Sequence, residues 1–384
     1  MYNNITKQKF DDLKKKNTVT VLAIETSCDE TAVSIVRNGT IVLSDILYSQ
    51  IDTHSVFGGV VPEIASRAHA EKILPLIDAS LKEAKLTFSD IDALAVTYTP
   101  GLVGALLVGV SAAKALSFAY NIPLIKVNHI EGHICANFLS GNVLLKPPFC
   151  AVVVSGGHTA IYNVTDYTTY NYIGGTTDDA IGEAFDKVAR FLNLPYPGGP
   201  QIDKLAQKGQ ANISFFKNQK TVSPDFKLSY SGLKTAVINY IHNFNQRFCH
   251  GDGGIAKIKA YKNPSKVACK NFGNTSVPVT KSAEINMSDL CASFTATACD
   301  LLIETVISAA KKHNLNTIAL AGGVAANTYL RTNLPKTAEK HNISVVIPPL
   351  RFCTDNAAMI ASRAYFAIKK GQDLAGLDLN AGIA

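Results

Sequence analysis

The sequence predicts an α/β protein built from two similar domains that face each other across a cleft. Two stretches, about 130 residues apart, repeat one order of elements: strand, polar turn, strand, strand, helix. The expected strands are residues 19–24, 32–36 and 41–44 in the first copy and 149–154, 159–164 and 170–173 in the second. The expected helices that follow are residues 63–85 and 178–194. Two copies of one unit predict two similar domains, whose polar turns border the cleft because ligands of α/β sheets bind at strand ends.

Apolar runs and turn residues predict the remaining elements. Asn38-Gly39 predicts a tight hairpin between the second and third strands, and Gly371 is expected at the C-cap of the last helix. Further strands are expected at residues 91–97, 124–127, 317–321 and 345–347. Further helices are expected up to residue 120, from residue 202, and at 233–245, 287–312, 324–330 and 355–370. Strands and helices thus alternate along most of the chain, which is typical of α/β proteins.

The length of 384 residues favours two domains. We expect a flexible basic leader at residues 1–18, an N-terminal domain at 19–147 and a C-terminal domain at 148–350. Residues 351–384 are expected to form a last helix that packs back on the N-terminal domain. Residues 249–281 lack apolar periodicity and contain several glycines, so they are interpreted as a basic insertion within the C-terminal domain.

The net charge of +7 comes from two segments outside the expected core. Residues 1–20 hold five Lys and two Asp, and residues 250–281 hold six Lys and one Asp. The rest of the chain is therefore nearly neutral. A basic surface suited to nucleic acid is not a bulk property of the core, although local patches remain compatible with the sequence.

The composition, 47% hydrophobic and 17% charged, describes a globular and enzyme-like protein. None of the eight cysteines has C-x-x-C spacing, which indicates reduced thiols and a cytoplasmic location. No apolar run is expected to span a membrane, since the best candidate, residues 105–120, is interrupted by Lys114. The polar, lysine-rich start does not have the pattern of a secretory signal.

The segment His129-Ile130-Glu131-Gly132-His133 holds two histidines four residues apart. On a helix this spacing puts both imidazoles on one face, where they can bind one metal ion. Asn128 is expected to be the N-cap of that helix, with Glu131 completing a variant of the capping box. From the spacing alone, two half-buried helical histidines with hydrogen-bond partners are as good an interpretation as a metal site.

Three glycine-containing segments follow expected strands or open helices. They are Ser155-Gly156-Gly157, Pro197-Gly198-Gly199-Pro200 and Gly322-Gly323. Bare backbone N–H groups can approach an anion closely, and a helix N-terminus favours negative charge. A plain tight turn is the simpler interpretation of any one of these segments. Together, at the strand ends of a duplicated α/β fold, they favour a nucleotide-binding cleft.

Four polar residues have both a structural and a functional interpretation. Asp186 could pair with Arg190 one turn later or accept ribose hydroxyls, and Asp203 could complement a helix dipole or bind ligand. Asn327 could read a base edge or simply sit at a helix start. Asp355 could be an N-cap or a third metal ligand. Two His and one Asp would leave open positions, which suits Fe(II) or Zn(II).

A zinc peptidase is disfavoured by the position of Glu131. Zinc peptidases of the H-E-x-x-H type carry the glutamate directly after the first histidine, whereas Glu131 follows His129 by two residues. At roughly 100° per residue, Glu131 points about 160–200° away from either histidine. It therefore faces away from the expected metal, and the capping role explains it better.

Nine segments in this order resemble the TsaD family, the universal tRNA threonylcarbamoyladenosine transferases. The segments are residues 24–31, 59–63, 128–133, 154–159, 182–187, 196–200, 229–235, 322–327 and 354–358. The resemblance extends from about Val19 to Lys370. Neither the leader nor the insertion belongs to the pattern, and the lysines of the insertion are interpreted as solvated surface charges in preference to contacts with tRNA phosphates.

The resemblance implies the fold of actin, Hsp70 and sugar kinases (the ASKHA fold), with two RNase H-like domains. It implies transfer of threonylcarbamoyl from threonylcarbamoyl-adenylate to N6 of adenosine 37, in tRNAs reading codons that start with A. It implies one Fe²⁺ per subunit, with Zn²⁺ as the alternative, held by His129, His133 and Asp355. The implied adenylate-binding residues are Val153, Val154, Ser155, Gly156, Gly157, Asp186, Gly199, Asp203 and Asn327.

The resemblance also implies partners: tRNA, a TsaB-type paralogue, a TsaE-type ATPase and an upstream threonylcarbamoyl-adenylate synthase. No side chain is identified as a general base, which fits catalysis by positioning and electrostatics. The main alternative is an actin-like ATPase or kinase with the same fold and a catalytic carboxylate near Glu25 or Asp29. The histidine pair argues against it, because Mg²⁺ prefers oxygen ligands. A regulatory binding protein without activity is a further alternative.

Overall fold

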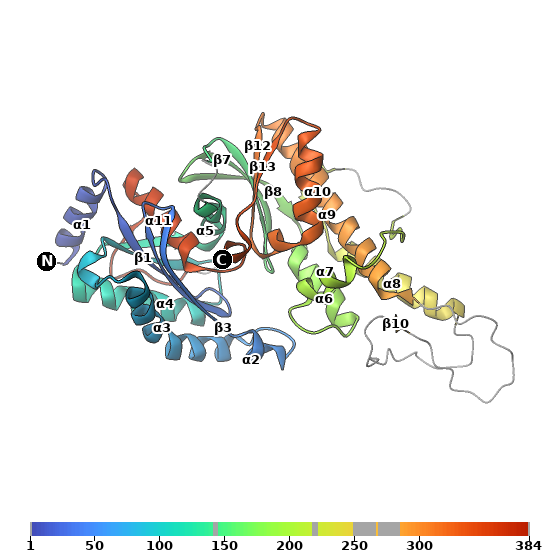
Figure 1. Cartoon of the computed structure of the whole chain (residues 1–384), viewed down its shortest axis with the longest axis horizontal. Coiled ribbons are helices and arrows are strands. Elements are labelled where there is room, and N and C mark those ends of the chain that lie inside the picture. Colours follow the sequence, from blue (N-terminus) through green and yellow to red (C-terminus); the bar gives the residue numbers. More distant parts are fainter. Residues whose placement is uncertain (1, 141–144, 217–221, 249–265, 268–284, 383–384) are drawn as a thin grey trace.

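Two six-stranded mixed sheets, one in each half of the chain, organise the structure (Figure 1). This computed structural model describes residues 2–140, 145–216, 222–248, 266–267 and 285–382. The first sheet has the order β14 (Leu374–Ala375), β5 (Leu124–Asn128), β4 (Ala93–Thr99), β1 (Thr20–Glu25), β2 (Glu30–Arg37), β3 (Ile41–Ser49). The second has the order β13 (Ser344–Val346), β12 (Thr317–Ala321), β6 (Phe149–Val154), β7 (Thr159–Asp166), β8 (Thr169–Thr176), β9 (Lys227–Leu228).

The two sheets repeat one pattern of strand pairing. In the first, β1–β2–β3 form an antiparallel meander, and β4 and β5 add in parallel beside β1. In the second, β6–β7–β8 form the meander, and β12 and β13 add in parallel beside β6. The predicted duplicated α/β fold is therefore confirmed. The Asn38-Gly39 hairpin is also confirmed, since both residues have positive φ, 53° and 68°.

Helices cover both faces of each sheet. They are α1 (Tyr2–Leu13), α2 (Ile51–Ser55), α3 (Pro62–Ala84), α4 (Val103–Tyr120), α5 (His129–Cys135), α6 (Ile181–Phe191), α7 (Gly198–Ala206), α8 (Ser231–Phe248), α9 (Met287–Lys312), α10 (Thr328–Glu339) and α11 (Ala357–Lys370). Short 3₁₀ turns are η1 (Phe88–Asp90), η2 (Ala136–Ser140), η3 (Gly323–Ala326) and η4 (Leu350–Phe352). The two-residue strands β10 (Lys266–Val267) and β11 (Ile285–Asn286) pair with each other.

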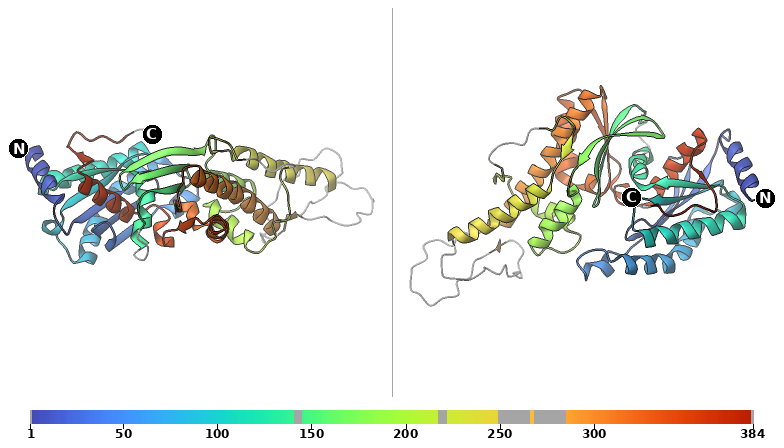
Figure 2. Two further views of the ribbon diagram at one scale, coloured as in Figure 1. Left: turned by 90° about the horizontal axis from the view of Figure 1, so that it is seen from above. Right: turned by 180° about the vertical axis from the view of Figure 1, so that it is seen from behind.

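Successive residues of the central strands point to opposite faces, so each sheet contributes to two cores. Leu22 and Ile24 of β1 face α3 and α4, whereas Val21 and Ala23 face α11. In the second sheet, one face packs against α6, α8, α9 and α10, and the other face packs against α5. Helices α5 and α11 also pack against each other and lie between the two sheets (Figures 1 and 2).

The N-terminal segment differs from the expected flexible leader. Residues Tyr2–Leu13 form α1, which buries Phe10 and Leu13 in the core shared with α11. Lys369 of α11 donates hydrogen bonds to the carbonyls of Leu13 and Lys16. The helix is polar apart from a few apolar residues, of which Phe10 and Leu13 are buried, so its sequence has no clear hydrophobic period from which a packed helix could be predicted.

The predicted insertion at residues 249–281 lies outside the described residues, apart from Lys266 and Val267. No membrane-spanning segment was expected, but among the described residues two helices are long and apolar enough to be candidates. By length and composition alone, α4 and α9 could each cross a membrane, although α9 is mostly buried within the second core. A buried core helix passes the same test, so this is weak evidence for a membrane protein.

Candidate active site

The histidine pair opens a short helix at the end of a strand of the first sheet. Asn128, the last residue of β5, caps α5, because its Oδ1 accepts hydrogen bonds from the N–H groups of Ile130 (2.8 Å) and Glu131 (3.4 Å). This cap was predicted. It places His129 and His133 one turn apart, with ring centroids 4.5 Å apart, and both side chains are buried.

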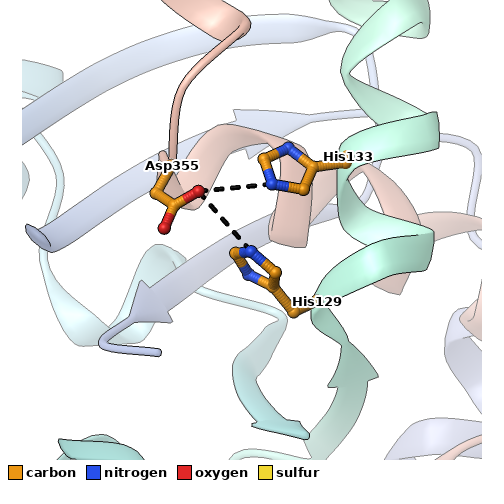
Figure 3. Close-up of side chains that lie close together, drawn as sticks. All are labelled: His129, His133 and Asp355. Atoms are coloured by element: carbon orange, nitrogen blue, oxygen red, sulfur yellow. Dashed lines mark ion pairs between the residues drawn. The ribbon is translucent and has the colours of Figure 1, made fainter. Parts of the chain in front are cut away.

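Asp355 joins this pair from the other end of the chain (Figure 3). Its Oδ1 lies 3.2 Å from Nε2 of His133 and 3.5 Å from Nε2 of His129. The N-cap of α11 is Asn356, whose Oδ1 accepts a hydrogen bond from Met359 N at 2.9 Å. Asp355 is therefore not needed as a cap, and its carboxylate is directed at the imidazoles instead.

The three side chains fit a metal ion by their donor atoms. One ligand atom from each of His129, His133 and Asp355 lies within 4.8 Å of the other two. Among the described residues, Nδ1 of the buried His133 has no hydrogen-bond partner, and its Nε2 lies 3.2 Å from Asp355 without a well-formed hydrogen bond. A buried imidazole that is poorly satisfied is costly unless something else binds it. Two nitrogens and one carboxylate oxygen form a donor set used for Fe(II) and Zn(II).

The charges of the triad compensate one another. Burial alone would lower the pKa of His129, but Asp355 and Glu25 raise it to about 9. Burial alone would raise the pKa of Asp355, but the two imidazoles hold it at about 2. Burial, together with the neighbouring His129, lowers the pKa of His133. Without a cation, the triad thus holds one proton, on His129, between an ionised carboxylate and a neutral imidazole.

A buried glutamate supports His129 from behind. Oε2 of Glu25, the last residue of β1, lies 3.3 Å from Nδ1 of His129 and accepts a hydrogen bond from Thr97. Its Oε1 accepts a hydrogen bond from Ser27 N at 2.6 Å. A carboxylate on the far nitrogen orients a ligating imidazole and raises its basicity. Sequence analysis assigned Glu25 no role at the metal. Its position at the end of β1 was the available signal, because β1, β4 and β5 are parallel and their ends share one edge of the sheet.

Glu131 points away from the triad, as predicted. Its Oε2 lies 2.7 Å from the guanidinium of the buried Arg363, which also pairs with Asp373 at 3.0 Å. The predicted capping-box role is wrong, because this ion pair holds the Glu131 side chain against α11. Glu131 therefore cannot activate a water molecule at the triad.

The triad opens into a cleft between the two sheets. The cavity has a volume of about 660 Å³, and it is lined by turns of both halves. The β1–β2 turn supplies Ser27 to Glu30, and the β6–β7 turn supplies Ser155 to His158. His129 and Asp355 line the same cavity. The duplicated turns thus meet on one space, as the repeated sequence pattern predicted.

Three predicted glycines leave this space open. A Cβ built on Gly156, Gly157 or Gly199 would meet no atom within 4 Å. Packing within the protein therefore does not require glycine at these positions. A ligand that lies directly against the backbone would require glycine there. Gly322 differs, since its φ is +90° and its Cβ would lie 2.4 Å from the carbonyl oxygen of Val154. The plain-turn interpretation holds for Gly322.

The predicted polar residues hold the walls of the cleft. Oδ1 of Asp186 accepts a hydrogen bond from Gly198 N at 2.8 Å, and Arg190 instead donates to the carbonyl of Gly58 at 2.7 Å. The pairing of Asp186 with Arg190 is therefore wrong. On the same helix, Glu183 instead pairs with Lys187 at 2.8 Å.

Asp203 connects α7 to the start of α10. It accepts hydrogen bonds from Nδ2 of Asn327 (3.1 Å) and from the hydroxyl of Thr328 (2.8 Å). Oδ1 of Asn327 caps α10 by accepting from Leu330 N. Asp203 and Asn327 both line the cavity, whereas the side chains of Val153 and Val154 belong to the cores on either side of β6.

Sequence analysis missed other residues of the cavity wall. Tyr196, which precedes the cis peptide bond to Pro197, lines the cavity, and so do Asp29 and Glu30 of the β1–β2 turn. Burial, together with the negative charges of Asp355 and Asp29, raises the pKa of Glu30 to about 10. A neutral Glu30 keeps the negative charge of this wall lower than the sequence indicates.

The sequence profile of TsaD, described as tRNA N6-adenosine threonylcarbamoyltransferase, matches residues 41–362. The chain belongs to the TsaD family. The TsaD relative from Clostridium novyi is 48% identical over 364 residues, covering 94% of this chain and 96% of its own length. The relative from Bacillus subtilis is 49% identical over 352 residues, covering 91% of each chain. Both carry the same name as the family.

Solved structures support the fold of this TsaD family member. Full-length HypF, in its phosphate- and nucleotide-bound form, has a TM-score of 0.57 at 13% identity. The match covers 92% of this chain and 46% of HypF. HypF from T. kodakarensis has a TM-score of 0.58 at 12% identity. At such low identity these structures report on the fold alone, which is the predicted ASKHA type.

Proposed function

We propose that this protein transfers the threonylcarbamoyl group from threonylcarbamoyl-adenylate to N6 of adenosine 37, in tRNAs that read codons starting with A. Membership of the TsaD family and relatives that carry this activity in their name support the proposal. The observation that carries it is structural. Two buried imidazoles and one half-buried carboxylate open into a cleft large enough for a nucleotide.

In this proposal, His129, His133 and Asp355 hold one Fe²⁺, with Zn²⁺ as the alternative. The ion, when bound, supplies Lewis-acid polarisation and a template for the oxygens of the donor. Glu25 fixes the orientation of His129 through Nδ1, which leaves Nε2 directed at the shared position.

The adenylate is proposed to lie against the backbone of Ser155, Gly156, Gly157 and Gly199. Open space above these three glycines supports this position. Asp186 holds the N-terminus of α7, and Asp203 with Asn327 holds the N-terminus of α10. These side chains accept hydrogen bonds from the first N–H groups of both helices, so they fix the two helix starts as walls of the proposed adenylate position. The side chains of Val153 and Val154 would not touch the adenylate; these residues would hold β6, and with it the turn that begins at Ser155, in position.

The chemical step needs positioning more than a side-chain base. The N6 amine of the acceptor forms a bond to the carbamoyl carbon, and the bond from that carbon to the phosphate oxygen breaks. AMP leaves with the electron pair, and N6 gives up one proton to water. The walls of the cleft hold donor and acceptor together and keep other nucleophiles out, which accelerates the transfer.

We further propose tRNA, a TsaB-type paralogue and a TsaE-type ATPase as partners. We also propose that a separate synthase supplies the adenylate, as the resemblance to the TsaD family implies. A cytoplasmic location fits the scattered cysteines and the tRNA substrate.

The test is incorporation of labelled threonine into tRNA by the full chain with its partner proteins and the adenylate. Wild type is expected to modify tRNA and to bind about one metal ion per chain. His133→Ala should lose both, and the only polar side-chain contact of His133 that it removes among the described residues is the one with Asp355. The control is His341→Ala, which removes an exposed histidine beyond α10.

Two outcomes would contradict these proposals separately. Unmodified tRNA with wild-type protein and active partners would overturn the assigned reaction. Full activity of His133→Ala without bound metal would overturn the metal centre and leave the reaction standing. ATP hydrolysis by this chain alone, with no threonine incorporation by the complete system, would favour the actin-like ATPase instead.

A further inference from the structure

A second, smaller cavity lies on the other side of α5 from the metal triad. Its volume is about 260 Å³. Asn128 and Glu131 line it from the start of α5, and Tyr162 and Tyr170 line it from β7 and β8. The proposed position of the adenylate leaves this cavity unused, because the adenylate lies in the other cleft, which is more than twice as large.

The two cavities meet at two residues. Pro100, after β4, and His158, in the β6–β7 turn, line both. Burial lowers the pKa of His158, and the charge of His129 in the triad lowers it further. A flat group in the small cavity would therefore have one edge beside the place where the donor is expected.

The walls of the small cavity suit a single nucleobase. Tyr162 and Tyr170 supply phenol rings, and aromatic rings stack with any of the nucleobases. Oδ1 of Asn128 is occupied by the first N–H groups of α5, so its Nδ2 hydrogens are the ones that can serve a ligand. Adenine offers ring-nitrogen acceptors to such donors. Glu131, fixed by Arg363, closes the polar end.

We propose that this cavity receives the adenine ring of the acceptor nucleotide, turned out of its RNA loop. The inference rests on the proposed function, and it assigns the acceptor a place of its own beside the donor cleft. Tyr162 stacks on the ring, and N6 points past Pro100 and His158 toward the carbamoyl carbon. N6 gains the carbamoyl group, AMP leaves with the electron pair of the broken bond, and the proton of N6 passes to water.

Only a nucleotide that leaves its stack can reach such a cavity. Enzymes that act on a base commonly extrude it and hold it between aromatic side chains. The larger cavity accommodates a whole nucleotide, and the smaller one accommodates a ring without its sugar and phosphate. The phosphates of the acceptor RNA would therefore stay outside, on the protein surface.

The experiment is a double-mutant cycle between Tyr162 and the acceptor base. Binding of the full chain with its partners is measured for two tRNAs, one with adenosine 37 and one abasic at that position, with AMP in the donor cleft. Wild type should prefer the intact tRNA by about tenfold, the effect expected for one stacked base. Tyr162→Ala should bind both tRNAs equally, and Tyr162→Phe, which keeps the ring, should restore the preference.

Controls separate this site from general folding and from the reaction. Tyr172→Ala removes a neighbouring ring that contacts Tyr162 without lining the cavity, and it should keep the preference. Affinity for AMP should be the same in all variants, which checks that each one folds. A tenfold preference retained by Tyr162→Ala, or absent from wild type, would overturn the acceptor site. Threonine incorporation by wild type is measured in parallel, and its absence would instead overturn the reaction.

Discussion

Metal binding by the triad should be strongly dependent on pH. In the protein without metal, the pKa of His129 is raised to about 9 by Asp355 and Glu25, against the effect of burial. His129 is therefore protonated at neutral pH, and it must lose that proton before Nε2 can bind a cation. Asp355, with a pKa of about 2, is already ionised, and the lowered pKa of His133 keeps it neutral. Binding should thus release about one proton per ion.

The size of the effect follows from that single proton. Each pH unit below the pKa of His129 lowers the apparent affinity about tenfold, or about 1.4 kcal/mol. Affinity for Zn²⁺ should therefore rise about tenfold between about pH 7 and 8 and level off above about pH 9. Competition with a chelator of known affinity measures the slope, and calorimetry in buffers of different ionisation enthalpy counts the protons.

Replacing Glu25 tests the cause. Glu25→Gln removes one of the two negative charges that raise the pKa of His129, so the affinity should level off at a lower pH. The plateau itself should fall about 10- to 100-fold, the usual cost of losing a carboxylate behind a ligating histidine. An affinity independent of pH in wild type, or no proton release, would refute the ionisation scheme. An unshifted curve in Glu25→Gln would refute the role of Glu25.

Three further predictions concern AMP binding and stability. Gly157→Ala fills open space, so it should weaken AMP binding at least tenfold in titrations with an unchanged Tm, whereas Gly322→Ala, strained at a φ of +90°, should lower the Tm. Arg363→Leu leaves the partly exposed carboxylates of Glu131 and Asp373 without their cation, so it should lower the free energy of unfolding in urea by about 2–3 kcal/mol. A decrease below about 0.5 kcal/mol would argue against a stabilising ion pair. Deleting residues 1–16 uncovers the site where Phe10 packs and should lower the free energy of unfolding by about 3 kcal/mol; an unchanged Tm would mean that α1 contributes nothing.

Much of the fold was predictable because its elements have strong local signals. The bounds of α9 and β12 agree with the expected residues 287–312 and 317–321. The hydrophobic periodicity of such elements can be read from their own residues, without knowing what packs against them. The structure of α1 was not predictable in this way. Its buried apolar side chains, Phe10 and Leu13, are stabilised by contacts with α11, which lies more than 340 residues later.

The site was predictable only where one segment carries the signal. The spacing of His129 and His133 and the cap at Asn128 are local, so sequence analysis found them. Spacing could not show that Asp355 lies 3.2 Å from His133, since more than 200 residues separate them, and the family resemblance supplied that expectation. Glu25 and the partner of Glu131 were missed for the same reason. Their roles depend on which strand or helix lies opposite.

The position of the triad ties metal binding to the arrangement of the two halves. His129 and His133 belong to α5, whose apolar side packs on the second sheet. Asp355 precedes α11, which packs on the first sheet. A shift of one half relative to the other would change the distances of 3.2 and 3.5 Å between Oδ1 and the two Nε2 atoms. A ligand that contacts the glycine turns and the triad together therefore favours one arrangement of the two sheets, because it binds best where all these groups converge.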